Sequence, residues 1–509
     1  MAKTQIPAEL EDLARDYRRL PLWKSIPALK RTPMDVFLAL KHLSRQCFIL
    51  ESLEDPDRWG RYTFIGYDPK LEISCVNGTL NIRNGTNLRI ETATPSSYIR
   101  QIIEDNRSPR LPGLPPLTGG LVGYFSYDYI KYSEGELNLD ADDQEGFKDA
   151  DLMLFDKLVV FDNHEKKILI IVNFNVSALE ENYRRALEEL EYLTGIVERG
   201  RKAEPPPLRL LSPFRSLFDR GQYCAMVERA KHHIREGDIF QAVLSNRLEA
   251  EVEGSLFNSY LVLRKLNPSP YMFYFSSDDI EIAGASPETL VKLENGTLFT
   301  FPLAGTRPRG KTPEEDAALE KELLADPKEL AEHNMLVDLG RNDIGKISKF
   351  GSVEVEKYLS IERFSHVMHI GSTVRGSIRE GKTAMDAIDA VLPAGTLSGA
   401  PKIRACRIIN ELENNKRGIY GGAIGYIAFT GNMDTCIAIR IAFKKNGKVF
   451  VRSGAGIVAD SVPEKEFEEC ENKMKAVIKA LEQSAGIAAG LTATGASGKP
   501  SAAEPGGST

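Results

Sequence analysis

The clearest alternation of apolar and polar positions runs from residue 420 to residue 457. A glycine-rich apolar run begins at Tyr420, an alternating segment covers residues 435–443, and a third run covers residues 449–452. The pair Asn446-Gly447 stands between the last two runs, and this dipeptide is the strongest short signal of a hairpin turn. The pattern therefore predicts an antiparallel meander.

The alternation over residues 435–443 also predicts which side chains share a face. One face carries Ile437, Ile439, Ile441 and Phe443, and the other carries Ala438, Arg440 and Ala442. A packed core would require larger side chains than those of the second face. That face instead offers room and a forked donor, which is what an anionic ligand needs.

A helical pattern follows over residues 461–481. Its apolar side chains recur at spacings of three and four, at Phe467, Cys470, Met474, Val477 and Leu481. Glu466, Glu469 and Lys473 lie along one border of this stripe. A solvated Glu–Lys pair on the helix surface is the alternative interpretation of that border. The functional interpretation is a carboxylate and an ammonium that reach a ligand lying over the sheet.

Two pairs of similar sequence segments, called echoes here, occur in the same order in both parts of the chain. They predict that the chain consists of two related halves. The frames beginning at Gly66 and Asn77 recur at a constant offset of 218 residues, at Gly284 and Asn295. The run 119–125 recurs, with a larger offset, as 421–427. Coincidental similarity of strand–turn–strand segments is the alternative, and the conserved order of the two echoes argues against it.

The pattern of predicted elements and the local composition divide the chain into four segments. Residues 1–204 form an N-terminal lobe whose first 45 residues are expected to be helical entry segments. Residues 205–218 form a linker stiffened by three consecutive prolines. Residues 219–483 form the region that carries the candidate chemistry. Residues 484–509, rich in Ala, Gly, Ser and Thr, are expected to be a disordered tail.

Composition narrows the class of protein. The 509 residues are 42% hydrophobic and 27% charged, as in globular proteins, and the net charge of -7 gives no support to nucleic-acid binding. No apolar run approaches membrane-spanning length, and the first ten residues lack an export signal. The six cysteines show no Cys-x-x-Cys spacing. We therefore expect reduced thiols and a cytoplasmic protein.

Acidic residues on two predicted helices suggest a metal site. Asp326 is expected to begin a helix on which Glu329, Glu332 and His333 share one face. Surface charge is the simpler interpretation of these glutamates. Glu332 together with Glu469 would nevertheless form the sparse carboxylate set that magnesium prefers. Zinc does not fit, because the chain has no His–Cys cluster.

Further candidate residues lie in loops and strand ends. Glu288 follows a predicted strand, and residues 301–310 form a basic, glycine-bearing loop suited to anions. His366 and His369 are three residues apart, although a lone histidine is more often structural. Residues 394–402 are small and precede a helix, so their backbone could approach a carboxylate closely.

Taken together and in this order, several motifs resemble the chorismate-utilising enzymes. They are PLAGTR (302–307), AEHNMLVDLGRND (331–343), VMH (367–369), GTLSGAPK (395–402), YGGAIGY (420–426) and SGAGIV (453–458). The resemblance covers roughly residues 10–483. It implies an α+β two-domain fold in which antiparallel sheets pack face to face with helices outside.

Within that family, the chain resembles the large subunits (component I) that form anthranilate, lyases of the first step of tryptophan biosynthesis. Relatives that make aminodeoxychorismate carry a nucleophilic lysine where this chain has Ala304. Relatives that add water carry a lysine base where this chain has Gln241. Aminodeoxychorismate synthase component I is the nearest alternative, and a catalytically inactive ligand-binding protein is an alternative of another class.

The resemblance also implies roles for individual residues. Glu332 and Glu469 would bind Mg²⁺, and Glu288 would protonate the departing C4 hydroxyl, with His369 assisting the elimination. Thr306 and Thr396 would line the site. Chorismate would be held by Tyr420, Arg440, Lys473 and the backbone amides near Gly454 and Gly456.

Partners and regulation follow from the same resemblance. Ammonia would come from a glutamine amidotransferase subunit (component II), and two large and two small subunits would form a heterotetramer. L-tryptophan would inhibit by binding between the two halves. Its site would comprise Glu51, Ser52, Asn267, Pro270, Tyr271 and Met272, with Tyr271 and Met272 packing on the indole.

Overall fold

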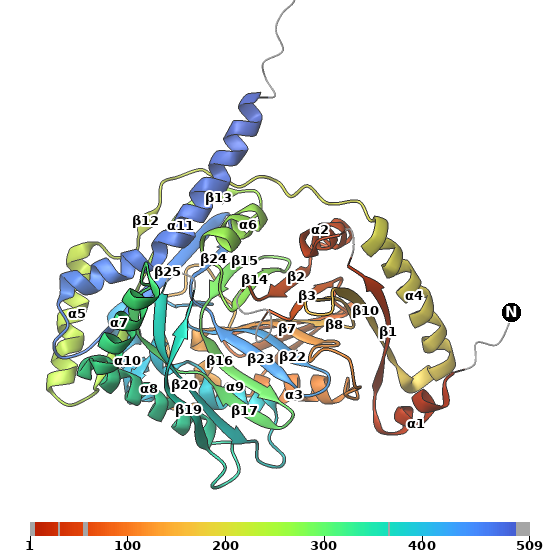
Figure 1. The fold of residues 1–509 in the computed structure, drawn as a ribbon, viewed down its shortest axis with the longest axis horizontal. Helices are drawn as coiled ribbons and strands as arrows, with labels where there is room; N and C mark the ends of the chain where they lie inside the picture. Colours follow the sequence, from red (N-terminus) through yellow and green to blue (C-terminus); the bar gives the residue numbers. More distant parts are fainter. Residues whose placement is uncertain (1–5, 29–30, 54–59, 365–366, 495–509) are drawn as a thin grey trace, which may run out of the picture.

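The computed structural model describes residues 6–28, 31–53, 60–364 and 367–494. In this part of the chain, two large antiparallel sheets form the centre of the molecule and helices lie outside them (Figure 1). This architecture confirms the predicted α+β fold with sheets packed face to face. The helices are α1 (Ala8–Asp16), α2 (Pro33–Leu43), α3 (Pro95–Glu104), α4 (Leu179–Arg199), α5 (Arg220–Arg235), α6 (Phe257–Leu266), α7 (Pro313–Ala325), α8 (Pro327–Gly345), α9 (Ala384–Val391), α10 (Lys402–Glu413) and α11 (Pro463–Thr494).

The first sheet, called sheet A here, contains strands from both halves of the chain. Its order is β1 (Arg19–Pro27), β10 (Lys167–Asn175), β9 (Lys157–Asp162), β3 (Tyr62–Tyr67), β2 (Cys47–Glu51), β14 (Tyr271–Ser276), β15 (Glu281–Ser286), β24 (Ile441–Lys445), β25 (Lys448–Ile457), β13 (Gln241–Glu253) and β11 (Arg209–Leu210). The short strands β12 (Arg215–Ser216) and β21 (Gly399–Ala400) also pair with β13.

The second sheet, sheet B, is shared in the same way. Its order is β18 (Leu303–Pro308), β20 (Val367–Ser377), β17 (Thr297–Thr300), β16 (Thr289–Glu294), β23 (Met433–Ile437), β22 (Ala423–Ala428), β7 (Gly120–Phe125), β8 (Ala150–Phe155), β4 (Leu71–Val76), β5 (Thr79–Asn84) and β6 (Thr86–Glu91), and β19 (Glu354–Arg363) pairs with β20.

The strand orders show the predicted repeat. In sheet A the halves meet where β2 pairs with β14, and in sheet B they meet where β7 pairs with β22. Outward from each junction the strands follow in corresponding order, so the molecule has an approximate internal two-fold arrangement. Gly123 and Gly425, which correspond in the echo of residues 119–125, face each other across the second junction. Both sheets therefore continue through both halves, and the predicted domain boundary near residue 204 remains a prediction.

Three apolar layers hold these elements together. The layer between the sheets contains aromatic side chains of both halves, among them Phe48, Phe155, Phe273 and Phe443. A second layer packs α2, α4, α5, α6, α10 and α11 on the outer face of sheet A. A third packs α3, α8 and α9 on the outer face of sheet B. Each sheet is thus buried on both faces through much of its area, as the apolar content of the strands requires.

Local signals place several helices and turns where the sequence predicts them. Asp219 and Gln222 form a capping box at the start of α5, and Asp326 caps α8 by accepting from the amides of Lys328 and Glu329. Asn446 and Gly447 both have positive φ values, of 51° and 73°, in the tight turn between β24 and β25. The predicted stripe of α11 is buried from Phe467 to Leu481.

Three segment predictions were wrong in part. Within the predicted helical entry, residues 19–27 form β1, whose apolar residues Leu20, Leu22 and Ile26 follow a period of two. The linker contains β11 and β12, which pair with β13, and Leu208, just before β11, is buried in the core. The predicted tail begins as helix, since α11 continues to Thr494 through an alanine-rich segment, and alanine favours helix. The rest of the tail lies outside the described residues.

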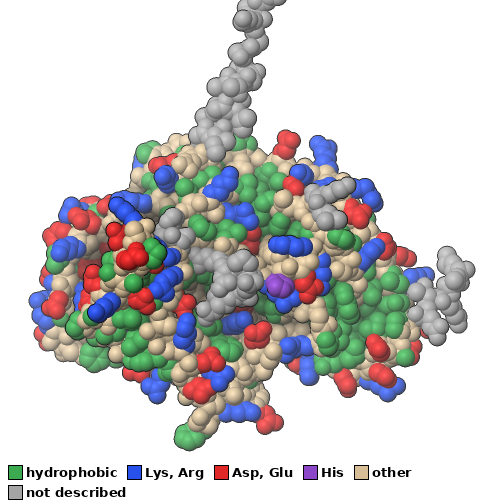
Figure 2. All heavy atoms as spheres, viewed as in Figure 1, with side chains coloured by type: hydrophobic (Ala, Val, Ile, Leu, Met, Phe, Trp, Pro, Cys, Tyr) green, Lys and Arg blue, Asp and Glu red, His purple; other side chains and the backbone are tan. Residues whose placement is uncertain are grey.

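The surface shows no large field of one sign on the face drawn in Figure 2, where acidic and basic side chains are intermixed. No helix in the described part of the chain is both long and apolar enough to cross a membrane.

Candidate active site

A cavity of about 730 Å³ lies in the second half of the chain, between residues 241 and 473. It is bordered by β13, β25, α8, α11 and the loops that precede β16 and β24. The structure brings nine of the predicted site residues to its wall: Glu288, Glu332, Thr396, Tyr420, Arg440, Gly454, Gly456, Glu469 and Lys473.

Two of these residues stand where the chain passes from one sheet to the other. Glu288 lies between β15 of sheet A and β16 of sheet B, and Arg440 lies between β23 of sheet B and β24 of sheet A. The two crossings are bonded to each other. The Ile437 amide donates to the Glu288 carbonyl at 2.9 Å, and the Ala285 amide donates to the Arg440 carbonyl at 3.2 Å.

The crossing at Arg440 corrects the predicted single strand over residues 435–443. The strand ends at Ile437 and another begins at Ile441, because Arg440 has a left-handed φ of 52° and redirects the chain into sheet A. A non-glycine residue in this region is strained, and such strain is concentrated at functional sites. Its guanidinium makes no hydrogen bond or ion pair within the described residues, so its donors are available to a ligand.

Glu288 has the protonation behaviour of a general acid. Burial in the cavity wall raises the pKa of its carboxyl to about 7, against the smaller lowering effects of Thr396 and Lys473. The Thr396 hydroxyl donates to Glu288 Oε1 at 3.1 Å and fixes the carboxyl in the cavity. Near neutral pH this carboxyl can therefore deliver a proton.

Lys473 links helix α11 to strand β25, which contains Gly454 and Gly456. Its ammonium pairs with Glu469 at 2.7 Å, one turn earlier on α11, and donates to the Gly454 carbonyl at 3.0 Å. A Cβ added at Gly454 would lie 2.6 Å from the Leu244 carbonyl oxygen, and one at Gly456 would lie 2.6 Å from Gln241 Nε2. The glycines therefore allow the strands and the cavity wall to approach this closely.

The carboxylates of α8 and α11 face the same space. Burial and repulsion from neighbouring carboxylates raise the pKa values of Glu332 and Glu466, and Glu469 is among the repelling groups for both. A hard cation between them would relieve this repulsion. Among the residues that the structure describes, no group of three His, Cys, Asp or Glu side chains could hold a metal by itself. The donor set thus fits a cation that takes further oxygens from water or substrate. Glu329 instead pairs with Arg307 at 3.5 Å.

Thr306 and His369 lie beside the cavity and are not part of its wall. His369 Nδ1 is 2.9 Å from the Gly305 carbonyl oxygen and 3.1 Å from the Thr306 hydroxyl. Because the carbonyl only accepts, Nδ1 carries the proton and Nε2 keeps its lone pair. Burial lowers the pKa of His369, and nearby Arg440 lowers it further, so the ring is neutral near pH 7. His366 lies outside the described residues.

Comparison with known proteins identifies the family. The family model of chorismate binding enzymes matches residues 31–479. The chain belongs to the chorismate-binding enzymes. It is 46% identical to anthranilate synthase component 1 of Acetivibrio thermocellus over 94% of this chain and 98% of that one. It is 45% identical to anthranilate synthase component 1 of Aquifex aeolicus over 93% of this chain and 97% of that one.

Solved structures agree with this membership. The crystal structure of anthranilate synthase component I from Streptococcus pneumoniae has a TM-score of 0.72 and 41% identity, covering 84% of this chain and 93% of that one. The menaquinone-specific isochorismate synthase MenF of Escherichia coli has a TM-score of 0.67 at 18% identity, covering 93% of this chain and 98% of that one, which shows a shared fold.

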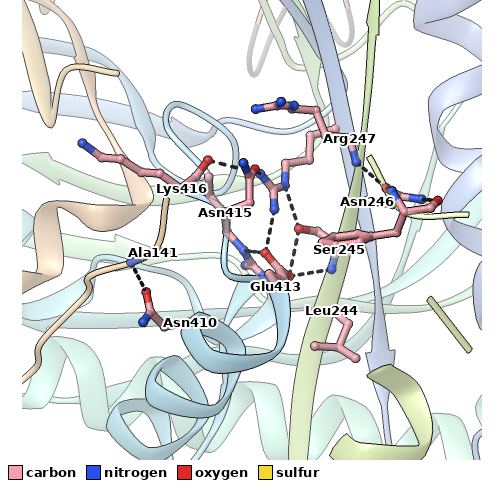
Figure 3. A network of polar contacts seen from close by, with 12 residues as sticks. Ala141, Leu244, Ser245, Asn246, Arg247, Asn410, Glu413, Asn415 and Lys416 are labelled. Atoms are coloured by element: carbon pink, nitrogen blue, oxygen red, sulfur yellow. Dashed lines mark hydrogen bonds and ion pairs between the residues drawn. The ribbon is translucent and has the colours of Figure 1, made fainter. Parts of the chain in front are cut away.

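A buried polar network joins distant segments of this chorismate-binding enzyme next to the cavity (Figure 3). The buried Glu413 carboxylate accepts from Arg452 Nη2 at 2.7 Å, from Arg417 Nε at 2.9 Å and from the Ser245 amide at 2.7 Å. Arg452 lines the cavity, and Arg417 lies over the Tyr127 ring and near the ring of Tyr420. The sequence analysis missed this network, because its members are far apart in the chain and carry no motif.

The predicted inhibitor residues meet where β2 pairs with β14. Met272 lies opposite Glu51 in this pairing, and the Leu53 amide donates to the Ser269 carbonyl at 3.3 Å. The buried Glu51 carboxylate already accepts from Arg264 Nε at 2.6 Å and from the Tyr260 hydroxyl. Asn267 and Pro270 lie in the loop between α6 and β14.

One part of that prediction was wrong. Tyr271 and Met272 do not form one wall, because consecutive strand residues point to opposite faces. Met272 packs in the layer between sheet A and its helices, whereas Tyr271 packs toward the layer between the sheets.

The elevated pKa of Glu288 predicts a pH-dependent stability effect. The folded pKa is about 7 and the ordinary value is 4.5, so ionisation of this group costs stability as pH rises through that interval. Glu288→Gln removes the cost. The variant's free energy of unfolding, relative to the parent, should rise by about 2 kcal/mol between about pH 5.5 and about pH 8.5. Urea unfolding at the two pH values measures it, and a difference that is independent of pH would contradict the assignment.

Proposed function

We propose that this chorismate-binding enzyme converts chorismate and ammonia to anthranilate, pyruvate and water, as the component I subunit of an anthranilate synthase, a lyase. The observation that carries the proposal is a carboxyl of pKa about 7, Glu288, beside a guanidinium with free donors, Arg440, in one cavity. The relatives at 41–46% identity are named anthranilate synthase component I, and these names support the same reaction.

The side chains account for the proton transfers. Glu288 gives its proton to the C4 hydroxyl of chorismate, which leaves as water while ammonia forms a bond to C2 and the ring double bond shifts. The ammonium group formed at C2 then loses a proton, which the ionised Glu288 carboxylate can take up. His369 Nε2 would accept the C2 proton when the C–O bond to the enolpyruvyl group breaks, and the departing enolpyruvate would take up a proton and tautomerise to pyruvate. Arg440, Lys473 and the backbone of Gly454 and Gly456 hold the two carboxylates, and Tyr420 flanks the enolpyruvyl arm.

The residues present favour ammonia over other nucleophiles. Gln241 lines the cavity, and its amide cannot deprotonate water. Ala304, in β18, cannot attack the ring, whereas the alternative, aminodeoxychorismate synthase component I, would use an amine at that position. An inactive binding protein would not need an acid with this pKa.

A separate glutaminase subunit is part of this proposal. Five of the six cysteines are buried, and burial raises the pKa of the sixth, Cys224, so the described residues offer no activated thiol for glutamine. We therefore infer that a component II amidotransferase supplies ammonia, in a heterotetramer of two large and two small subunits. All six thiols are free, which suits a reducing cytoplasm.

An assay of the isolated chain tests the function. With chorismate, Mg²⁺ and ammonium, anthranilate fluorescence should appear, and the rate should rise with pH toward the pKa of ammonium, because only ammonia has a lone pair. Glutamine should give no product until a component II subunit is added. Absence of anthranilate with ammonium, or glutamine-dependent turnover by the chain alone, would overturn the proposal.

We propose Mg²⁺ as the cofactor, held by Glu332 and Glu469 with Glu466 nearby. When bound, the cation neutralises the ring carboxylate of chorismate and draws charge from the ring. The mutual repulsion of these carboxylates is the structural support for the site.

Glu469→Gln keeps the shape of the side chain and removes its charge. Calorimetric Mg²⁺ affinity in the presence of chorismate should fall about tenfold or more, together with turnover, because a coordinating charge is lost. Glu471→Gln is the matched control, since Glu471 is an exposed residue of α11 two positions further on and lines neither this cavity nor the adjoining pocket that contains Arg440 and Glu469. Equal Mg²⁺ affinity in Glu469→Gln and the control would refute the assignment.

We also propose feedback inhibition by L-tryptophan at the β2–β14 junction. The Glu51 carboxylate is bound by Arg264, so the ammonium of the amino acid would have to share or displace this ion pair. A ligand there would contact both halves of the molecule.

Ser52→Phe should fill this site. We expect the variant to keep its ammonium-dependent rate within about twofold and to require at least about tenfold more tryptophan for half-inhibition, because the ring occupies the ligand volume. Inhibition curves measure both quantities. Unchanged sensitivity in the variant would place the inhibitor elsewhere, and an insensitive parent enzyme would refute the regulation.

A further inference from the structure

The connection that carries Glu288 is short and held on several sides. Only Pro287 and Glu288 separate the last residue of β15, Ser286, from the first residue of β16, Thr289. The Ser286 hydroxyl donates to the Ile437 carbonyl at 2.7 Å, and the Ile437 amide donates to the Glu288 carbonyl at 2.9 Å. These contacts tie one side of the connection to the neighbouring crossing.

Tyr271 spans the other side. Its backbone pairs with Ser286 in the β14–β15 ladder, and its hydroxyl reaches Thr289 Oγ1 at 2.8 Å. The same hydroxyl donates to Asp434 Oδ1 at 2.9 Å, so the bond with Thr289 is donated by the threonine. One residue thus contacts both ends of the two-residue connection, Ser286 through its backbone and Thr289 through its hydroxyl.

The surroundings make these bonds difficult to replace. Tyr271 packs against the aromatic layer between the sheets, and Thr289 is buried. Burial raises the pKa of Tyr271 and of Asp434, which shows that water stabilises neither charge well. Loss of the Tyr271 hydroxyl would remove the hydrogen-bond partner of Thr289 Oγ1 and of the Asp434 carboxyl, both in buried surroundings. Leaving these groups unpaired costs free energy, and a shift of the β15–β16 connection would reduce that cost.

We propose that the Tyr271 hydroxyl is a positioning group for Glu288: it braces the β15–β16 connection through Thr289 and Asp434, and so holds the general acid against the departing hydroxyl of the substrate. This inference rests on the proposed function. Glu288 itself is bonded to Thr396, which comes from another segment, so the brace sets the position of the backbone while Thr396 orients the carboxyl.

Tyr271→Phe tests the brace, because it removes one oxygen and keeps the ring. We expect kcat with ammonium to fall about tenfold or more while KM for chorismate changes less than about twofold, since misplacing an acid affects proton transfer more than binding. Tyr274→Phe is the matched control. Tyr274 lies on the same strand, is fully buried and bonds Lys41 and Ser255 on the opposite face, away from Glu288. Its kcat should stay within about twofold of the parent.

A mutant cycle separates bracing from a general loss of stability. Thr289→Val should lower kcat similarly, and the double variant should be no slower than the slower single variant, because both changes break one connection. Multiplying effects in the double variant would overturn the proposal, as would a parent-like kcat in Tyr271→Phe. Tyr274→Phe as slow as Tyr271→Phe would overturn it as well.

A crystal structure of Tyr271→Phe gives a readout that does not depend on activity. The backbone of residues 287–289 should be displaced and the Thr396–Glu288 bond lengthened or lost. An unmoved Glu288 would overturn the brace. If the parent forms no anthranilate, the proposed function fails by that result alone, and the crystal structure still decides whether Tyr271 positions Glu288.

Discussion

The candidate site depends on one constraint, the pair of adjacent crossings by which the chain passes between the two sheets. At each crossing the ladder of one sheet has ended and that of the other has not begun, so a side chain there can face open space. Backbone hydrogen bonds between the crossings fix Glu288 and Arg440 relative to each other. The proposed general acid and the proposed anion-binding guanidinium are therefore held by backbone geometry, which is more rigid than side-chain packing alone.

The first half of the molecule has crossings between the sheets at the corresponding places. Asp156 separates β8 from β9 as Arg440 separates β23 from β24, and Asp68 lies just beyond β3 in the other crossing. Here the space is closed by ion pairs, Lys157 with Asp68 at 2.9 Å and Arg19 with Asp156 at 3.6 Å. The two halves share an architecture and differ in the charges at the crossings. Opposite charges pair at the crossings of the first half, whereas Glu288 and Arg440 line a cavity in the second half.

The sequence predicted what is encoded locally. The capping residue Asp326 marked the start of α8, the Asn446-Gly447 pair marked a hairpin, and the sequence analysis named nine residues of the cavity wall. The passage between sheets was not predictable from periodicity, because Ile437, Ile439 and Ile441 continue the alternation through the break. The Glu413–Arg417–Arg452 network was also missed, since its buried charges are compensated only after residues 245, 413 and 452 meet in the fold. Tertiary contacts of this kind leave no periodic or compositional trace.

The start of β14 lies between the junction of the two halves and the connection that carries Glu288. Each of its two faces contacts one of them. On the outer face, Met272 lies opposite Glu51, whose carboxylate is held by Arg264 of α6, and the loop before the strand runs from that helix. On the inner face, the very next side chain, Tyr271, reaches the connection that carries Glu288. A ligand that shifts the loop on the outer face must move the strand end. The strand end cannot move without Tyr271, because adjacent residues of a strand share one rigid backbone segment. The junction of the halves is therefore linked to the connection that carries Glu288, the proposed acid, by one side chain and its hydrogen bond with Thr289. Two separate arrangements of that strand end would be sufficient for coupling between the sites.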